Sequence, residues 1–143
     1  MSKYNLDELN IYVIDDDPIF MKIITQFMEK IKSTLTTPIP FKFSYFDNTN
    51  AFYDSADPTI PAIVILDYRL DKDDDSDISG LDILEEVKSF NPKLKIISYT
   101  GESGDIVKHK LLFGGASHFI QKGAKSLKEF EKALVIEITE LIR

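Results

Sequence analysis

The sequence contains no cysteine and only two histidines, His109 and His118, among its 143 residues. Without cysteine the chain forms neither a disulfide nor a thiolate metal site, and a zinc site would have to combine histidine with carboxylates. No apolar run approaches the ~18 residues of a membrane-spanning helix. The N-terminal "MSKYNLDELN" also lacks the apolar core of a signal peptide. We therefore expect a cytoplasmic protein of bacterial type that does not insert into a membrane.

Basic residues are also scarce: 17 lysines and arginines stand against 24 aspartates and glutamates, which gives a net charge of −7. Nucleic-acid binding requires clustered basic side chains for the phosphates, so we expect no direct binding of DNA or RNA. The acidic balance suits a cation site or a basic partner. The length and the 43% share of hydrophobic residues favour a single domain over residues 1–143.

Apolar segments alternate with amphipathic ones along the whole chain. The apolar segments predict strands at 10–15, 41–46, 62–67, 95–100 and 117–121. Helices are predicted from Pro18 to the break at "TTPIP", then at 48–56, 80–90 and 103–113, and from Ser126 to the C-terminus. Such alternation predicts a parallel sheet covered by helices on both faces. The expected fold is α/β: a flavodoxin-like (βα)5 three-layer sandwich with strand order 2-1-3-4-5.

Polar residues stand where four of these strands end. Asp15 and Asp16 end the first strand, Asp67 ends the third, Thr100 ends the fourth, and Lys122 follows the fifth. In an open parallel sheet, ligands bind beyond the carboxyl ends of the strands, where the strand order switches. We therefore expect three carboxylates to converge on one crevice, with a hydroxyl and an ammonium across from them.

Three neighbouring carboxylates repel one another unless a positive charge joins them. A hard divalent cation such as Mg²⁺, or Mn²⁺, takes oxygen ligands of this kind together with waters and a phosphate oxygen. If a phosphoryl group is present, Lys122 would offset its charge and Thr100 would donate a hydrogen bond to it. Asp67 lies centrally and is the natural nucleophile, because carboxylates can form aspartyl-phosphate.

Each of these residues also has a plain structural interpretation. Asp15 and Asp16 alone could be a solvated loop, and Asp17 is most simply the N-cap of the next helix. Thr100 alone could be structural, and Lys122 alone could be a surface lysine. The functional interpretation depends on their convergence.

The segments "VIDDDP", "VILDYRL", "SGLDIL", "IISYTG" and "GGASHFIQKG" occur in an order and spacing that resemble one family. Over roughly residues 8–142 the chain resembles the receiver domain of two-component response regulators, the CheY-like superfamily. The resemblance implies that Asp67 is the phosphoacceptor, Asp16 a direct Mg²⁺ ligand and Asp15 its partner in the acidic pair. It also implies roles for the backbone carbonyl of Arg69 as a metal ligand, Thr100 as the switch hydroxyl, Lys122 as the phosphate-binding lysine and Phe119 as the switch aromatic.

By this resemblance the protein is a phosphorylation-activated signalling receiver rather than a metabolic enzyme, although it would promote its own phosphoryl transfer and dephosphorylation. Its expected partner is a histidine kinase or a histidine phosphotransfer protein, which donates to Asp67 in a Mg²⁺-dependent reaction. Phosphorylation would then reshape the face formed by the fourth helix, the fifth strand and the fifth helix. The same face is a candidate surface for a homodimer.

Three features depart from the family pattern. Gly123 follows Lys122 where the family commonly has proline, so the turn that carries the lysine is not locked. Phe119 replaces the commoner tyrosine and has no hydroxyl to bond. The segment from Asp67 to Gly80 is longer than usual. Gly123 and the long segment favour an alternative, a phosphorylation-independent interaction module that keeps the fold.

The long segment contains "DKDDDSDISGLD", residues 71–82, in which acidic residues alternate as in a calcium-binding loop. Ser76 stands where such loops need glycine, and Asp82 stands where they carry a bidentate glutamate. A solvated acidic insertion is the simpler interpretation, and a weak Ca²⁺ site is the alternative. His109 is expected at the surface, and His118 is expected to point outward from Phe119 or to lie at the strand edge. Neither has a carboxylate pattern that suggests catalysis.

Overall fold

The computed structural model describes residues 7–34, 39–67, 80–100, 112–123 and 126–142. Five strands form one sheet within these residues, in the order β2-β1-β3-β4-β5, and every neighbouring pair is parallel. The strands are β1 (Leu9–Ile14), β2 (Phe41–Phe46), β3 (Ile63–Asp67), β4 (Lys95–Thr100) and β5 (His118–Gln121). The predicted flavodoxin-like fold and its strand order are confirmed.

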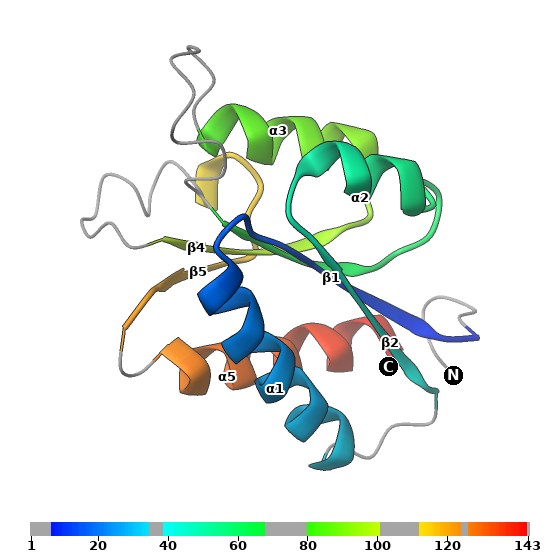
Figure 1. The fold of residues 1–143 in the computed structure, drawn as a ribbon. Coiled ribbons are helices and arrows are strands. Elements are labelled where there is room, and N and C mark those ends of the chain that lie inside the picture. Colours follow the sequence, from blue (N-terminus) through cyan, green and yellow to red (C-terminus); the bar gives the residue numbers. More distant parts are fainter. Residues whose placement is uncertain (1–6, 35–38, 68–79, 101–111, 124–125, 143) are drawn as a thin grey trace.

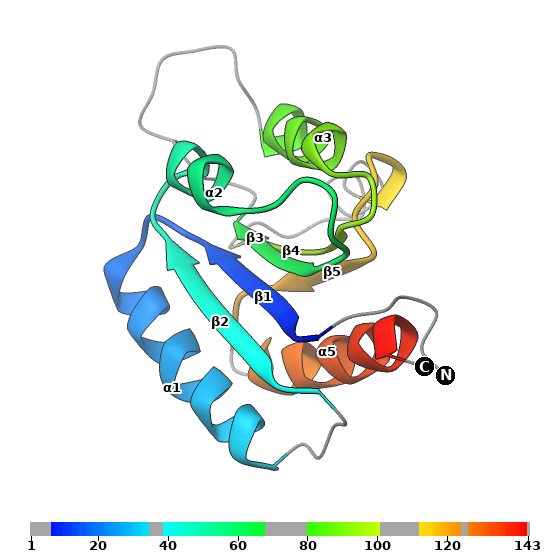
Figure 2. The same cartoon turned by 90° about the vertical axis from the view of Figure 1, so that its right-hand side faces the viewer.

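Helices cover both faces of this sheet (Figure 1). They are α1 (Pro18–Thr34), α2 (Thr49–Ser55), α3 (Gly80–Phe90) and α5 (Ser126–Ile142). Figure 2 shows α1 and α5 on one side of the sheet and α2 and α3 on the other. The helix predicted at 103–113 lies largely outside the described residues. No described helix combines the length and the apolar composition that crossing a bilayer requires.

The start of α1 follows from its sequence. Oδ1 of Asp17 accepts hydrogen bonds from the backbone N–H groups of Ile19, at 3.0 Å, and Phe20, at 3.4 Å. Asp17 is therefore the helix cap that the sequence predicts, and Pro18 occupies the first turn, where its missing N–H costs nothing. Ile19 and Ile23, which the periodicity assigns to the apolar face, are 73% and 45% exposed, so that part of the prediction is wrong.

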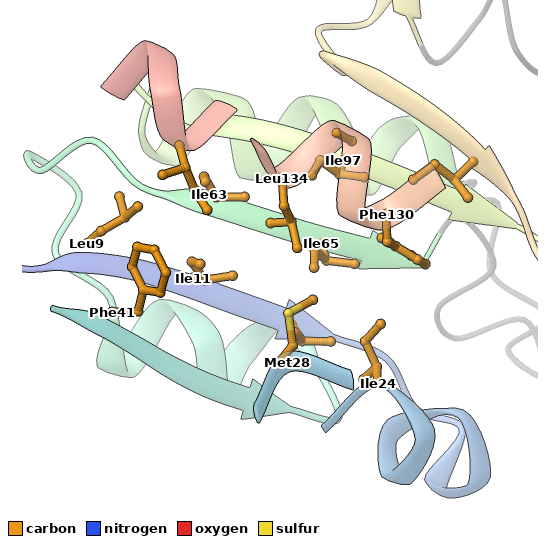
Figure 3. Close-up of a cluster of buried hydrophobic side chains, with 14 of the residues drawn as sticks. Leu9, Ile11, Ile24, Met28, Phe41, Ile63, Ile65, Ile97, Phe130 and Leu134 are labelled. Carbon is orange, nitrogen blue, oxygen red and sulfur yellow. The ribbon is translucent and has the colours of Figure 1, made fainter. Parts of the chain in front are cut away.

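Alternate residues of each strand enter two separate cores. One core lies between the sheet and α1 with α5 (Figure 3), and it takes Ile11 and Val13 from β1 and Ile97 and Tyr99 from β4. The other core lies beneath α2 and α3 and takes the intervening residues, such as Ile14. Because side chains alternate along a strand, residues two positions apart within it lie on the same face of the sheet.

Candidate functional site

Three carboxylates meet at the carboxyl ends of β1 and β3, as the sequence predicts. Asp15, Asp16 and Asp67 each offer one oxygen, and these oxygens all lie within 4.8 Å of one another. β1 and β3 are neighbours in register, with Ile14 beside Leu66, so the residues that follow them must come together. The cluster is thus a direct product of the strand order.

The three carboxylates differ in exposure. Asp15 is 1% exposed and Asp67 is 4% exposed, whereas Asp16 lies at the surface. A surface hollow of about 530 Å³ lies beside Asp15 and Asp16, which follow β1, and is lined also by Met21 and Asp47. Solvent or a small ligand therefore approaches the cluster from the side of Asp16.

The buried carboxylate of Asp15 is held by hydrogen bonds on both of its oxygens. The backbone N–H of Asp17 donates to Oδ1 at 2.8 Å, and the hydroxyl of Tyr99 donates to Oδ2 at 2.5 Å. In addition, the backbone N–H of Asp15 donates to the carbonyl of Phe46 at 3.0 Å, which ties the site to β2. A buried carboxylate requires donors of this kind, because an unpartnered charge in the interior is very costly.

Tyr99 lies on β4 and was not identified from the sequence. Its side chain is completely buried. Burial, followed by the negative charge of Asp15, raises the pKa of the Tyr99 phenol well above its usual range, so the hydroxyl stays protonated and acts as a donor. One signal could have indicated its role: Tyr99 directly precedes the predicted site residue Thr100, and it pairs with Asp67 across the β3–β4 ladder. It also occupies the same face of the sheet as Ile97, two positions earlier.

Lys122 follows β5 and brings the positive charge. Its Nζ lies 3.7 Å from Oδ2 of Asp15 and 3.8 Å from Oδ2 of Asp67, and its side chain is 25% exposed. The same Nζ lies over two aromatic rings, 4.8 Å from the centroid of Phe20 and 4.9 Å from that of Tyr99. The predicted convergence of the ammonium with the carboxylates is therefore present.

Gly123, which stands where the family commonly has proline, is hydrogen-bonded to the start of α5. The hydroxyl of Ser126, the first residue of α5, donates to the carbonyl of Gly123 at 2.9 Å, and the backbone N–H of Ser126 donates to the same oxygen at 3.1 Å. Ser126 is 5% exposed. These two bonds tie the carbonyl of Gly123, directly after Lys122, to the first residue of α5.

Of the other predicted site residues, the structure describes Phe119 in full and Thr100 in part. Phe119 is half-buried on β5 and packs against the core beneath α2 and α3. Thr100 is the last residue of β4, and the position of its hydroxyl lies outside what the structure describes. Arg69, the loop at 71–79 and His109 also lie outside the described residues.

His118 has a carboxylate partner that the sequence pattern does not reveal. Its Nε2 lies 2.8 Å from Oε1 of Glu137 on α5, and Glu137 is only 6% exposed. The pair joins β5 to α5. The separation of 19 residues hides this contact from any local sequence pattern.

The comparisons with known proteins agree with this geometry. Residues 11–134 match the model of the response regulator receiver domain family. The chain belongs to that family. No curated protein matches the chain.

Solved structures share the fold at low sequence identity. An RcsB response regulator from Salmonella typhimurium superimposes with a TM-score of 0.75 at 19% identity, over 96% of this chain and 63% of that one. The signal receiver domain of a DNA-binding response regulator from Colwellia psychrerythraea 34H gives 0.71 at 20% identity, over 92% and 98%. A CheY-like receiver domain protein from Methanospirillum hungatei JF-1 gives 0.67 at 18% identity, over 93% and 95%. The chain thus spans less than two thirds of the RcsB chain and nearly all of the isolated receivers.

Proposed function

We propose that this protein accepts a phosphoryl group on Asp67 and thereby switches a signalling state. The observation that carries the proposal is the convergence of Asp15, Asp16 and Asp67 with the ammonium of Lys122 at the carboxyl edge of the sheet. Membership of the receiver family supports the same function. The site offers a nucleophile, a neutralising charge and an open side for a phosphoryl donor, which phosphoryl transfer requires.

The acidic cluster fits a magnesium ion, or manganese in its place. Its donors are all carboxylate oxygens, which hard divalent cations prefer, and exposed Asp16 leaves room for the waters that Mg²⁺ retains. Asp15, Asp16 and Asp67 would hold the ion together, and Asp16, the exposed member, is proposed as a direct ligand by family resemblance. When bound, the ion neutralises charge on the transferring phosphoryl group. The backbone carbonyl of Arg69 is proposed as a further ligand by family resemblance.

In the proposed reaction an oxygen of Asp67 attacks the phosphorus atom of a phosphohistidine on a histidine kinase or a phosphotransfer protein. The new O–P bond forms as the P–N bond breaks, and the electron pair of that bond returns to the histidine ring. Lys122, 3.8 Å from Asp67, offsets the negative charge that arrives with the phosphoryl group. The protein acts as a phosphoacceptor rather than as a metabolic enzyme. It promotes this transfer and the later hydrolysis of the aspartyl-phosphate that forms.

The proposed output is a shift in population between two conformations. The hydroxyl of Thr100 would donate to the phosphoryl oxygens, and Phe119 would move further inward, which alters the surface around β5 and α5. Because Phe119 has no hydroxyl, packing alone would set its position. The same surface is the proposed site of homodimer formation, and the net charge of −7 argues that this domain does not itself bind nucleic acid.

Titration with beryllium fluoride, a phosphoryl mimic, tests this function. With Mg²⁺ present, we expect amide resonances at the ends of β1, β3 and β4 to shift in NMR spectra of the wild-type protein and not in those of Asp67→Asn. Asp47→Asn, an exposed change beside the site, serves as the control and should respond like the wild type. Spectra of the wild type that do not change at saturating mimic would reject the proposal.

A further inference from the structure

The ammonium of Lys122 lies between two carboxylates without closing on either. Its distances to Asp15 and Asp67, 3.7 Å and 3.8 Å, both exceed the 2.7–2.9 Å of a charge-assisted hydrogen bond. The positive charge of Lys122 is therefore shared nearly equally by Asp15, each of whose oxygens accepts a hydrogen bond, and by the proposed phosphoacceptor Asp67. Some feature of the protein must keep the lysine from pairing with Asp15 alone.

Two aromatic rings lie beneath the ammonium. The rings of Phe20, from α1, and Tyr99, from β4, have centroids 4.9 Å apart and planes inclined by 30°. Nζ of Lys122 lies over both, at 4.8 Å and 4.9 Å from the centroids, which is within the range of cation–π attraction. The end of the Lys122 side chain therefore packs on two rings, one from α1 and one from β4.

The hydroxyl of Tyr99 has a second effect on the same lysine. By donating to Oδ2 of Asp15 at 2.5 Å, it occupies the carboxylate oxygen that is nearest to Lys122. An oxygen that already accepts a short hydrogen bond attracts a second donor less strongly. The ring of Tyr99 therefore supports Lys122 while its hydroxyl competes for Asp15.

We infer that Phe20 and Tyr99 are positioning residues for Lys122, holding its ammonium where it can serve a phosphoryl group on Asp67. This inference rests on the proposed function and adds to it two residues outside the acidic cluster. It also explains how Lys122 keeps its place although glycine, and not proline, follows it: the rings hold the end of the side chain, and Ser126 holds the turn.

Two variants separate the contributions. Phe20→Leu removes one of the two rings beneath Lys122, from a half-buried position on α1. Tyr99→Phe keeps the second ring and removes only the hydroxyl. Phe130→Leu is the matched control, because the buried Phe130 packs against Tyr99 and Phe20, with centroids 5.3 Å and 6.4 Å away, and the substitution retains both rings that lie beneath Lys122.

The first measurement needs neither metal nor phosphoryl donor. Protons over the face of an aromatic ring are shielded, so the methylene protons next to Nζ of Lys122 should resonate upfield of those of other lysines in the metal-free protein. We expect Phe20→Leu to lose much of this upfield shift and Phe130→Leu to keep it. The same chemical shift in wild type and Phe20→Leu would overturn the inference.

The second measurement is the rate at which acetyl phosphate modifies Asp67 in the presence of Mg²⁺. Phe20→Leu and Tyr99→Phe should each slow this rate about tenfold, because misplacing a catalytic group by about 1 Å can cost about a hundredfold and we expect a smaller displacement here. Phe130→Leu should react at the wild-type rate. If it slows as much as Phe20→Leu, loss of packing explains the effect and the inference is wrong. A wild-type protein that is not modified would reject the proposed function, while the metal-free chemical shifts would still decide where Lys122 lies.

Discussion

The hydroxyl of Tyr99 donates a 2.5 Å hydrogen bond to Oδ2 of Asp15, and both side chains are buried. The bond joins β4 to the end of β1 across the intervening strand β3, at the level where β3 ends in Asp67. It provides a negatively charged cluster with a neutral donor from within the core. The stability of the metal-free fold should therefore depend on this single hydroxyl.

Tyr99→Phe is expected to lower the free energy of unfolding by about 1–3 kcal/mol in the absence of metal, because a buried carboxylate loses a donor. Urea denaturation followed by circular dichroism measures this change. In an Asp15→Ala background the same substitution should cost about 0.5 kcal/mol or less, since the interaction is already gone. Equal costs in the two backgrounds would show that the hydroxyl does not act through Asp15.

Mg²⁺ should stabilise the protein through the acidic cluster. At a concentration one hundred times its dissociation constant, an ion that binds only the folded state adds about 2.7 kcal/mol. We expect a rise in melting temperature with Mg²⁺ for the wild type and little or no rise for Asp16→Asn, which removes a charge from the exposed ligand. Asp47→Asn, nearby but outside the cluster, should keep the wild-type response; an equal loss in this control would point to general electrostatics.

The contact between His118 and Glu137 should stabilise the junction of β5 and α5. His118→Ala leaves the carboxylate of Glu137 buried without this partner, and we expect a loss of about 1–3 kcal/mol in the free energy of unfolding. Glu140→Ala, an exposed change on the same helix, should cost no more than about 0.5 kcal/mol. A cost for His118→Ala as small as that of the control would show that the contact is energetically neutral.

Most of the fold could be predicted from the sequence because its signals are local. Continuous apolar runs define the strands, and caps such as Asp17 and Asn48 define where helices begin. The acidic cluster could also be predicted, since a parallel sheet brings the ends of neighbouring strands to one edge. Ile19 and Ile23 were misassigned because periodicity identifies an apolar face but not how far the neighbouring elements extend over it.

The residues that sequence reasoning missed act over long separations. Tyr99 is 84 positions from Asp15, and as a large aromatic residue inside a strand it is expected simply to pack in the core. Its function depends on which face of β4 carries it and on how far β1 extends beside β3. Phe20 likewise reads as an ordinary core residue of α1, and only the path of the chain after β5 brings Lys122 over its ring.

Asp67 is proposed to accept a phosphoryl group in a reaction that needs the acidic cluster. The most direct test is to incubate the protein with acetyl phosphate and Mg²⁺ and to locate the modification by mass spectrometry. We expect one phosphoryl group per chain, on Asp67. The modification should not form when EDTA has removed the metal beforehand, and it should be absent from Asp67→Asn. A wild-type chain that stays unmodified with Mg²⁺, or one modified at another residue, would contradict the account.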